Sequence, residues 1–293
     1  MRYAVFIASH INYDGQLDYL INAIKSVKNQ DYKNGNIDIW LSISFKNTDF
    51  KDEFDALMIA DNCFKCFIHD KQMYQMEHFK VLNDNSYLDY LYELIFFLDD
   101  DDTYSVDRIS KFDELYKNTY KFNKDVFNQT LVFWEDAKAI CNNGKPISCY
   151  IYWTFAVKQD AFNAFFSIFK ERNLQHIKAD MLLKMYFERL LAFNDEAVAD
   201  NGLYNYNTEN DNSVTASKSN KNDNIYLRTC MNDKKFLEKH FGRNYKSKID
   251  KTLWRTCYEA FHRYKTIEEF YDSIAIIINK NLSGKKIRSL KLF

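Results

Sequence analysis

Residues 94–104 have the sequence Leu-Ile-Phe-Phe-Leu-Asp-Asp-Asp-Asp-Thr-Tyr, in which an apolar run ends in four consecutive carboxylates. The apolar part, residues 94–98, is typical of a buried strand. Four successive like charges repel one another, and a bound divalent cation is one way to hold them at the end of such a strand. Open α/β sheets bind ligands beyond the carboxyl ends of their strands. A solvated acidic loop is the alternative, because charge runs commonly lie in solvent.

Strands and helices alternate through the first hundred residues. Residues 3–9 predict a strand, and the apolar spacing of residues 17–27 predicts a helix. Further strands are predicted at 37–45 and 64–69, and helices that include 54–60 and 87–92. Such alternation predicts a largely parallel sheet.

The middle of the chain favours antiparallel strands, which would make the sheet mixed. These strands are predicted at 126–134, 137–141 and 147–157, with a turn at Asn142-Asn143-Gly144-Lys145. A helix at 181–191, a polar loop at 205–224 and a helical segment at 232–283 follow. The fold class is therefore α/β, with a mixed, mainly parallel sheet flanked by helices and a helical C-terminal extension.

The amino-acid composition limits the classes of binding partner that we expect. Forty basic and 41 acidic residues give a net charge of -1, so no global field favours nucleic acid, and none is expected as a partner. We see no apolar stretch of membrane-spanning length and no cleavable signal, which predicts a cytoplasmic protein. The basic C-terminal residues suggest a weak contact with a membrane surface, or a frayed tail. The six cysteines supply no second pair at zinc spacing beside Cys63 and Cys66, which favours structural thiols.

Several motifs are carried by specific residues. The first helix ends in Ser-Val-Lys-Asn-Gln-Asp-Tyr at residues 26–32, and Asn83 precedes Phe97-Leu-Asp-Asp-Asp-Asp102. Ala179-Asp180-Met-Leu-Leu183 opens a helix with an acid. With residues 155–162 and 203–215, these motifs cover residues 2–217. They resemble the nucleotide-sugar-dependent glycosyltransferases of the GT-A fold, most closely family 2.

The resemblance implies a domain plan and an activity. Residues 1–217 would form the GT-A domain, with a nucleotide-sugar half at about 1–104 and an acceptor half at about 105–217, and residues 218–293 the helical extension. The implied reaction moves a sugar from a nucleotide-diphosphate donor, with a UDP-sugar expected, to a glycan or lipid-linked acceptor. Inversion at the sugar and dependence on Mn²⁺ or Mg²⁺ are expected with it.

Metal and donor contacts follow from the same resemblance. Asp99, Asp101 and Asp102 would bind the metal, and Asp99 would also approach the donor ribose. Asp100 would point to the opposite face, because adjacent residues of a strand alternate. The remaining donor contacts would come from Ser9, His10, Ser44 and Asn83. For Ser9 and His10, a satisfied loop residue is the alternative.

The resemblance also implies contacts to the acceptor, from one acidic residue and from a group of aromatic side chains. Asp180 would be the general base, with an ordinary helix N-cap as the alternative. Trp134, Tyr152 and Trp153, together with Tyr150, would form an apolar acceptor platform. Core packing is the alternative role for these aromatic residues.

Three departures from the family pattern keep other functions open. The family's second strand ends in an acid that reads the nucleotide base, whereas the strand here ends Leu41-Ser-Ile-Ser44. Leu82 replaces the arginine before the asparagine, and Glu209 replaces a late histidine. A catalytically silent GT-A-like module that binds a glycan or a partner is the second hypothesis. A nucleotidyltransferase of related fold is the third, although no Gly-rich phosphate loop lies near the first strand.

Overall fold

A computed structural model describes residues 1–58, 64–89, 91–122, 132–135, 138–140, 146–148, 152–168, 171–176, 179–191, 197–198 and 202–207. The chain divides into two compact units, Met1–Ala216 and Ser217–Phe293. All described residues belong to the first unit. The predicted C-terminal helices and the basic tail lie outside them, as does Glu209.

A seven-stranded sheet forms the centre of the described unit, in the order β10-β6-β9-β4-β1-β2-β3. Four strands run parallel: β1 (Arg2–Ile11), β2 (Asn36–Phe45), β3 (Phe64–His69) and β4 (Leu94–Asp99). Burial on both faces explains the apolar runs of β1, β2 and β4, and every residue from Tyr3 to Ile7 has no exposed surface. Strand β3, at the edge of the sheet, is only partly buried.

The other three strands make the sheet mixed, as predicted. Strand β9 (Phe155–Val157) is antiparallel to β4 and to β6 (Val132–Glu135), and β10 (Ala197–Val198) runs parallel to β6. The prediction of a continuous strand over 147–157 is wrong, because the 3-10 turn η1 (Tyr152–Thr154) precedes β9. This turn directs the Trp153 carbonyl to Arg108 Nη2, at 2.9 Å, instead of to a neighbouring strand.

Two small ribbons lie beside the main sheet. Strand β5 (Thr103–Tyr104), which begins just after the four acids, pairs antiparallel with β11 (Tyr204–Asn205). Strand β7 (Lys138–Ile140) pairs antiparallel with β8 (Pro146–Ser148). The first ribbon joins the segment around Asp102 to residues a hundred positions later in the chain.

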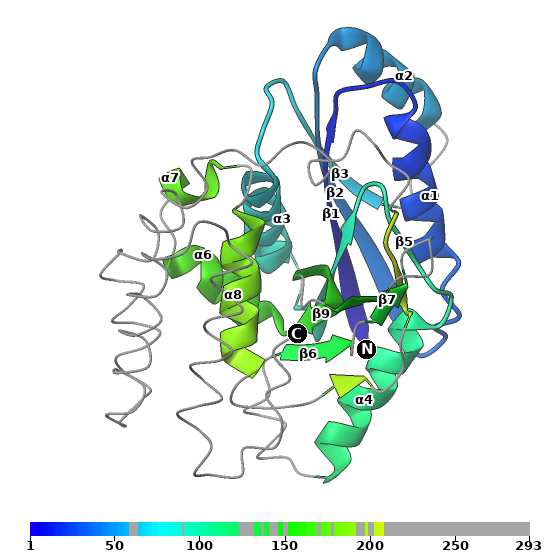
Figure 1. The fold of residues 1–293 in the computed structure, drawn as a ribbon, viewed down its shortest axis with the longest axis vertical. Coiled ribbons are helices and arrows are strands. Elements are labelled where there is room, and N and C mark those ends of the chain that lie inside the picture. Colours follow the sequence, from blue (N-terminus) through cyan, green and yellow to red (C-terminus); the bar gives the residue numbers. More distant parts are fainter. Residues whose placement is uncertain are drawn as a thin grey trace. The chain divides into compact units, whose positions relative to one another are not determined.

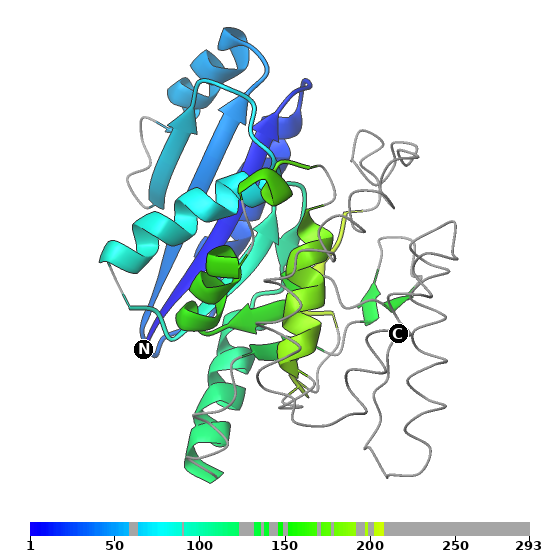
Figure 2. The same ribbon diagram turned by 90° about the vertical axis from the view of Figure 1, so that its left-hand side faces the viewer.

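Helices cover both faces of the sheet (Figures 1 and 2). One face carries α3 (Gln75–Asp89), α6 (Gln159–Ile168) and α8 (Asp180–Leu191), and the short α7 (Glu171–Leu174) lies near α3. The other face carries α1 (Gln16–Lys28) and α4 (Arg108–Phe122), and α2 (Thr48–Met58) follows β2. None of the helices in the described ranges is long and apolar enough to cross a membrane.

The motif at the end of α1 has a clear structural role. Ser26 Oγ accepts a hydrogen bond from the Tyr104 backbone nitrogen (3.1 Å). Gln30 Nε2 donates to the Ser105 carbonyl (2.7 Å), and Gln30 Oε1 accepts from the backbone nitrogen of Ile109 (2.9 Å) in the first turn of α4. These residues hold the chain in place directly after the carboxylate run.

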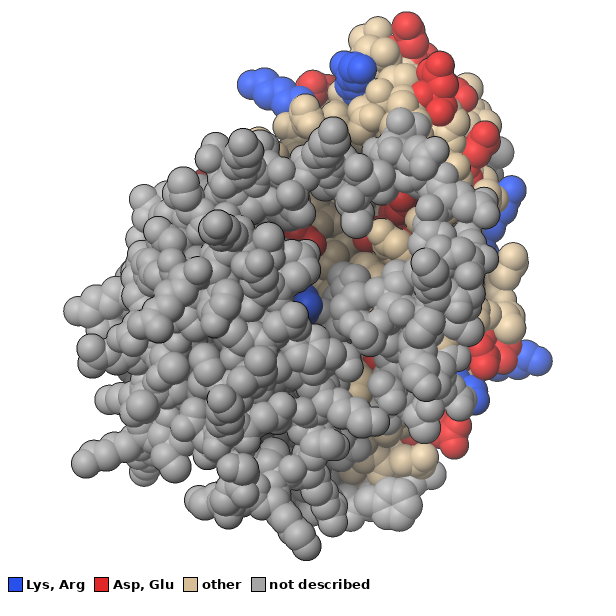
Figure 3. All heavy atoms as spheres, in the orientation of Figure 1, with Lys and Arg blue, Asp and Glu red and all other residues tan. Residues whose placement is uncertain are grey.

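Figure 3 shows both acidic and basic side chains on the described surface. This mixture agrees with the near-zero net charge of the whole sequence. The carboxylates at the end of β4 therefore stand out as a local concentration of charge.

Candidate functional site

The carboxyl ends of β1, β2 and β4 meet at one edge of the sheet. Strand β1 lies between the other two, and Ala8 is in register with Asp99 on β4 while His10 is in register with Ser44 on β2. After β1 the chain continues to β2 on one side of β1, and after β3 it crosses to β4 on the other side. This reversal creates the switch point at which α/β sheets bind ligands.

Asp99, at the end of β4, is held from the face of the sheet that carries α3. Gln75 Nε2 donates to its Oδ1 at 2.9 Å, and the Tyr152 hydroxyl donates to the same oxygen. Burial raises the pKa of Asp99, and the charges of Asp101, Asp100 and Asp180 raise it further, against the lowering effect of the Tyr152 bond. The cluster therefore includes the acid at the start of α8.

Asp100 turns to the opposite face. Its Oδ2 accepts from Ser9 Oγ at 2.5 Å and from Gln16 Nε2, in α1, at 3.1 Å. Figure 1 shows α1 and α3 on opposite sides of the sheet. Burial and the charge of Asp101 raise the pKa of Asp100 to about 7, and the two hydrogen bonds oppose that shift.

Asp102 is the most enclosed of the four acids, with 1% of its surface exposed. Its Oδ2 accepts from the Tyr204 hydroxyl and its Oδ1 from the Asn207 backbone nitrogen, both at 2.7 Å. Burial, Asp99 and Asp101 raise the pKa of Asp102. Because Asp101 raises the pKa of all three neighbouring acids, it is electrostatically central to the cluster.

Asp180 is the first residue of α8 and is partly exposed. Its charge raises the pKa of Asp99 and that of Tyr152, so the carboxylate lies within electrostatic reach of both groups. The structure thus brings the predicted base and the predicted metal ligands into one cluster. Whether Asp180 acts as a base stays a prediction.

Two of the predicted donor contacts, His10 and Ser44, belong to a continuous chain of side chains that alternate between histidine and serine. Going along it, His10 Nδ1 is 2.9 Å from Ser44 Oγ, which is 3.2 Å from His78 Nε2. His78 Nδ1 is 2.8 Å from Ser42 Oγ, which is 2.8 Å from His69 Nε2. Ser42, His69 and His78 were not predicted from the sequence. The spacing of the two serines, which places both on one face of β2, was the available signal.

This histidine–serine chain is uncharged near neutral pH. Burial, followed by the charges of His69 and His10, lowers the pKa of His78 to about 3. Burial also lowers the pKa of His10 and of His69. The end of β2 therefore presents neutral hydrogen-bonding groups where the family that the sequence resembles has an acid.

Asn83 lies inside the protein, with none of its surface exposed. Its Nδ2 donates to Asn163 Oδ1, in α6, at 3.1 Å. Its Oδ1 is buried without a hydrogen-bond partner among the described residues. The side chain thus faces the α3–α6 interface, and a donor contact from Asn83 stays a prediction.

The predicted acceptor aromatics are interior residues. Tyr152 is 2% exposed, Trp153 1% and Trp134 9%. The Tyr152 hydroxyl is bound to Asp99, and the Trp153 ring stacks on Tyr204 with centroids 4.0 Å apart. Tyr150 lies outside the described residues. An acceptor platform from these rings stays a prediction, and the contacts of Tyr152 connect it to the carboxylates.

The carboxylates fit a hard divalent cation by their chemistry. Within the part of the chain that is described, no three His, Cys, Asp or Glu side chains already form a metal-ligand group. Asp99, Asp101 and Asp102 nevertheless offer the oxygen ligands that Mg²⁺ and Mn²⁺ prefer, and their mutual repulsion is what a cation would relieve.

No family model matches this chain, and no curated protein does. Solved structures match it in fold. TarS 1-349 from S. aureus in complex with UDP aligns at a TM-score of 0.57 and 12% identity, over 97% of this chain and 88% of that one. The same protein in complex with UDP-GlcNAc aligns at a TM-score of 0.57 and 13% identity, over 95% and 81%. A longer TarS structure is covered over 54% of its length.

The chain has the GT-A fold. This confirms the fold class predicted from the motifs around the acidic run. At 12–13% identity the likeness concerns the fold, and it transfers no site residue from TarS to this chain. The assignment of roles therefore rests on the contacts described above.

Proposed function

We propose that this chain is a metal-dependent glycosyltransferase, which moves a sugar from a nucleotide-diphosphate donor, a UDP-sugar first, to a glycan or lipid-linked acceptor. One observation carries the proposal. Asp99, Asp101, Asp102 and Asp180 form a single electrostatic cluster at the switch point of a GT-A sheet. The solved complexes of TarS with UDP and UDP-GlcNAc support the choice of donor class.

Asp180 carries the proton in the proposed reaction. An acceptor hydroxyl gives its proton to the Asp180 carboxylate while its oxygen bonds to the anomeric carbon of the donor sugar. The bond from that carbon to the diphosphate breaks, and the nucleoside diphosphate leaves with the electron pair. A single displacement of this kind inverts the anomeric configuration. A positioned base contributes roughly 10²–10⁴-fold to such a step.

Asp99, Asp101 and Asp102 would hold the divalent cation. When bound, Mn²⁺ or Mg²⁺ supplies Lewis-acid stabilisation of the charge on the departing diphosphate. The protein's own contribution is to fix the acids: Gln75 and Tyr152 orient Asp99, and the segment that follows β10 orients Asp102. Ser9, His10 and Ser44, at the adjoining strand ends, would contact the nucleoside.

A catalytically silent module is the second candidate, and one observation favours it. The end of β2 presents neutral groups, because Ser44 is bound to His10 and His78 and no acid stands at its position. A protein that keeps the fold and has lost donor recognition would bind a glycan or a protein partner without turnover.

A panel of nucleotide sugars, assayed with Mn²⁺, with Mg²⁺ and with EDTA, separates the two candidates. The proposal expects metal-dependent release of nucleoside diphosphate from at least one donor, and UDP-sugars are tested first. Asp180→Asn is the matched variant, because it should retain donor binding and lose turnover. Absence of release from every donor, in a protein that still binds glycans, would support the silent module instead.

A further inference from the structure

Tyr204 connects two of the four acids through a single oxygen. Its hydroxyl accepts a hydrogen bond from the Asp99 backbone nitrogen at 3.1 Å and lies 2.7 Å from Asp102 Oδ2. A phenol has one proton, and an N–H can only donate, so the hydroxyl proton must go to the Asp102 carboxylate. Burial and the charge of Asp102 raise the pKa of Tyr204, which keeps the phenol protonated and able to donate.

The segment around Tyr204 binds both oxygens of Asp102. Tyr204 donates to Oδ2 and the Asn207 backbone nitrogen to Oδ1. Two donors on separate oxygens fix both the position and the plane of a carboxylate. Asp102 is thereby oriented by residues 204–207, which follow it in the chain by more than a hundred positions.

Glu135, at the end of β6, holds this segment in place. Its Oε1 accepts from two successive backbone nitrogens, those of Leu203 and Tyr204, both at 3.0 Å. From the other side, the Ser105 backbone nitrogen donates to the Leu203 carbonyl at 2.9 Å. A single carboxylate oxygen of Glu135 thus accepts backbone hydrogen bonds that a neighbouring strand would otherwise accept at the start of β11.

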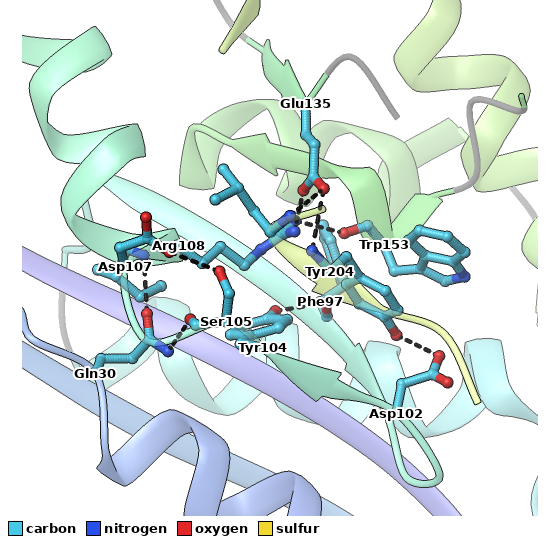
Figure 4. A network of polar contacts seen from close by, with 12 residues as sticks. Gln30, Phe97, Asp102, Tyr104, Ser105, Asp107, Arg108, Glu135, Trp153 and Tyr204 are labelled. Carbon is cyan, nitrogen blue, oxygen red and sulfur yellow. Dashed lines mark hydrogen bonds and ion pairs between the residues drawn. The ribbon is translucent and has the colours of Figure 1, made fainter. Parts of the chain in front are cut away.

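Arg108 completes the arrangement in Figure 4. Its guanidinium pairs with Glu135, and neither side chain has any exposed surface. Arg108 Nη2 also donates to the Trp153 carbonyl (2.9 Å), and Trp153 stacks on the Tyr204 ring. Removing one member of a buried ion pair is strongly destabilising, because it leaves the other charge without its partner, so Arg108 and Glu135 hold this segment together as a pair.

We propose that Tyr204 is a positioning residue of the cation site, and that the buried Arg108–Glu135 pair acts on that site through Tyr204. The inference deepens the proposed function and rests on it. Tyr204 orients Asp102 and fixes the end of β4 at Asp99, whereas Arg108 and Glu135 pair with each other and lie away from Asp102 in Figure 4. Outer partners of metal ligands typically change metal affinity by about 10–100-fold when they are removed.

The test compares Tyr204→Phe with Tyr104→Phe. Both variants remove one buried phenolic hydroxyl from the same aromatic cluster, in which the two rings lie 5.7 Å apart. The Tyr104 hydroxyl donates to the Phe97 carbonyl at 2.6 Å, so its loss perturbs the packing without removing a donor to an acid. The measurement is the dissociation constant of Mn²⁺ by isothermal titration calorimetry at saturating UDP.

We expect Tyr204→Phe to weaken Mn²⁺ binding by about tenfold or more, and Tyr104→Phe to change it by less than about threefold. Equal constants for the two variants, with binding by the wild type intact, would overturn this inference alone. If the wild type binds no UDP with either Mn²⁺ or Mg²⁺, the proposed function is wrong, and this inference falls with it.

A measurement on the wild-type protein keeps the test valid if Tyr204→Phe does not fold. Coupling between sites is reciprocal, so binding of Mn²⁺ with UDP should slow amide hydrogen exchange at Leu203 and Tyr204, which donate to Glu135. The Ile109 amide, which donates to Gln30, is the internal reference. Protection confined to residues other than 203 and 204 would contradict a link through Tyr204.

Discussion

Mild acid should destabilise the protein through His78. The folded protein holds this imidazole between Ser42 and Ser44, and burial lowers its pKa from 6.5 to about 3. In the unfolded chain, the same side chain gains a proton as the pH falls below about 6.5. Between these two values the unfolded state binds more protons than the folded state. Stability therefore falls as the pH falls through this window, and the contribution is constant above it.

The size of the effect follows from the two pKa values. At about pH 5.5 the unfolded state gains roughly RT ln(1 + 10), or about 1.4 kcal/mol, and at about pH 7.5 the gain is below roughly 0.1 kcal/mol. The full difference would be reached only below the folded pKa. The effect of His78 on stability is therefore best measured between about pH 7.5 and about pH 5.5.

The assay is urea unfolding of the wild type and of His78→Gln at both pH values. Glutamine retains hydrogen bonding toward Ser42 and Ser44 and does not titrate. The comparison between proteins is necessary because the raised pKa values of Asp99, Asp100 and Asp102 act with the opposite sign, since these acids bind protons more readily when folded.

Between about pH 7.5 and pH 5.5, the wild type should lose about 1.4 kcal/mol more of its free energy of unfolding than His78→Gln loses. His10→Gln should show the same sign and a smaller difference, because His10 is only half-buried. The reasoning fails if the wild type and His78→Gln lose stability equally between the two pH values.

Three further predictions concern the carboxylates. UDP at a hundredfold excess over its Kd, with Mn²⁺, should stabilise the protein by about 2.7 kcal/mol in thermal unfolding, and no shift with any nucleoside diphosphate and either metal would refute the donor site. Asp101→Asn should abolish that shift. Asp100→Asn should affect it much less, because the Asp100 carboxylate is bound to Ser9 on the other face of the sheet, and equal effects would indicate a diffuse acidic patch. Asp180→Asn should lower transfer by roughly a hundredfold or more with nucleotide binding intact, and near-wild-type transfer would leave Asp180 as a helix cap, since Asn caps as well as Asp.

The parallel half of the sheet was predictable because its signals are local. Strands buried on both faces require continuous apolar runs, and those of β1 and β4 were recognised in the sequence. The motif that ends α1 marks a contact between distant segments, since Gln30 binds the start of α4. The break at Tyr152–Thr154 was missed because it depends on Arg108, which is 45 positions from Trp153.

The candidate site was only partly predictable, and the reason is sequence distance. The acids of the run and Asp180 carry their own signal, because carboxylates at a strand end or a helix start suggest chemistry. His78 lies in the first turn of α3, with nothing near it in sequence to suggest Ser42, which is 36 positions away. Glu135 resembles any acid at a strand end until the chain brings Leu203 and Tyr204 against it.

The acidic run itself shows why sequence alone could not decide between a solvated loop and a site. Three of the four acids in the run are held by hydrogen-bond donors, and each by donors from a different part of the fold. Asp99 is held from α3 and η1, Asp100 from β1 and α1, and Asp102 from residues 204–207. A solvated loop would need none of these donors, because water would supply its hydrogen bonds. Donors that converge from several elements hold the charges in fixed directions while burial and repulsion raise their pKa values. That combination costs stability in the absence of a cation, and it is the arrangement that a cation-binding function would explain.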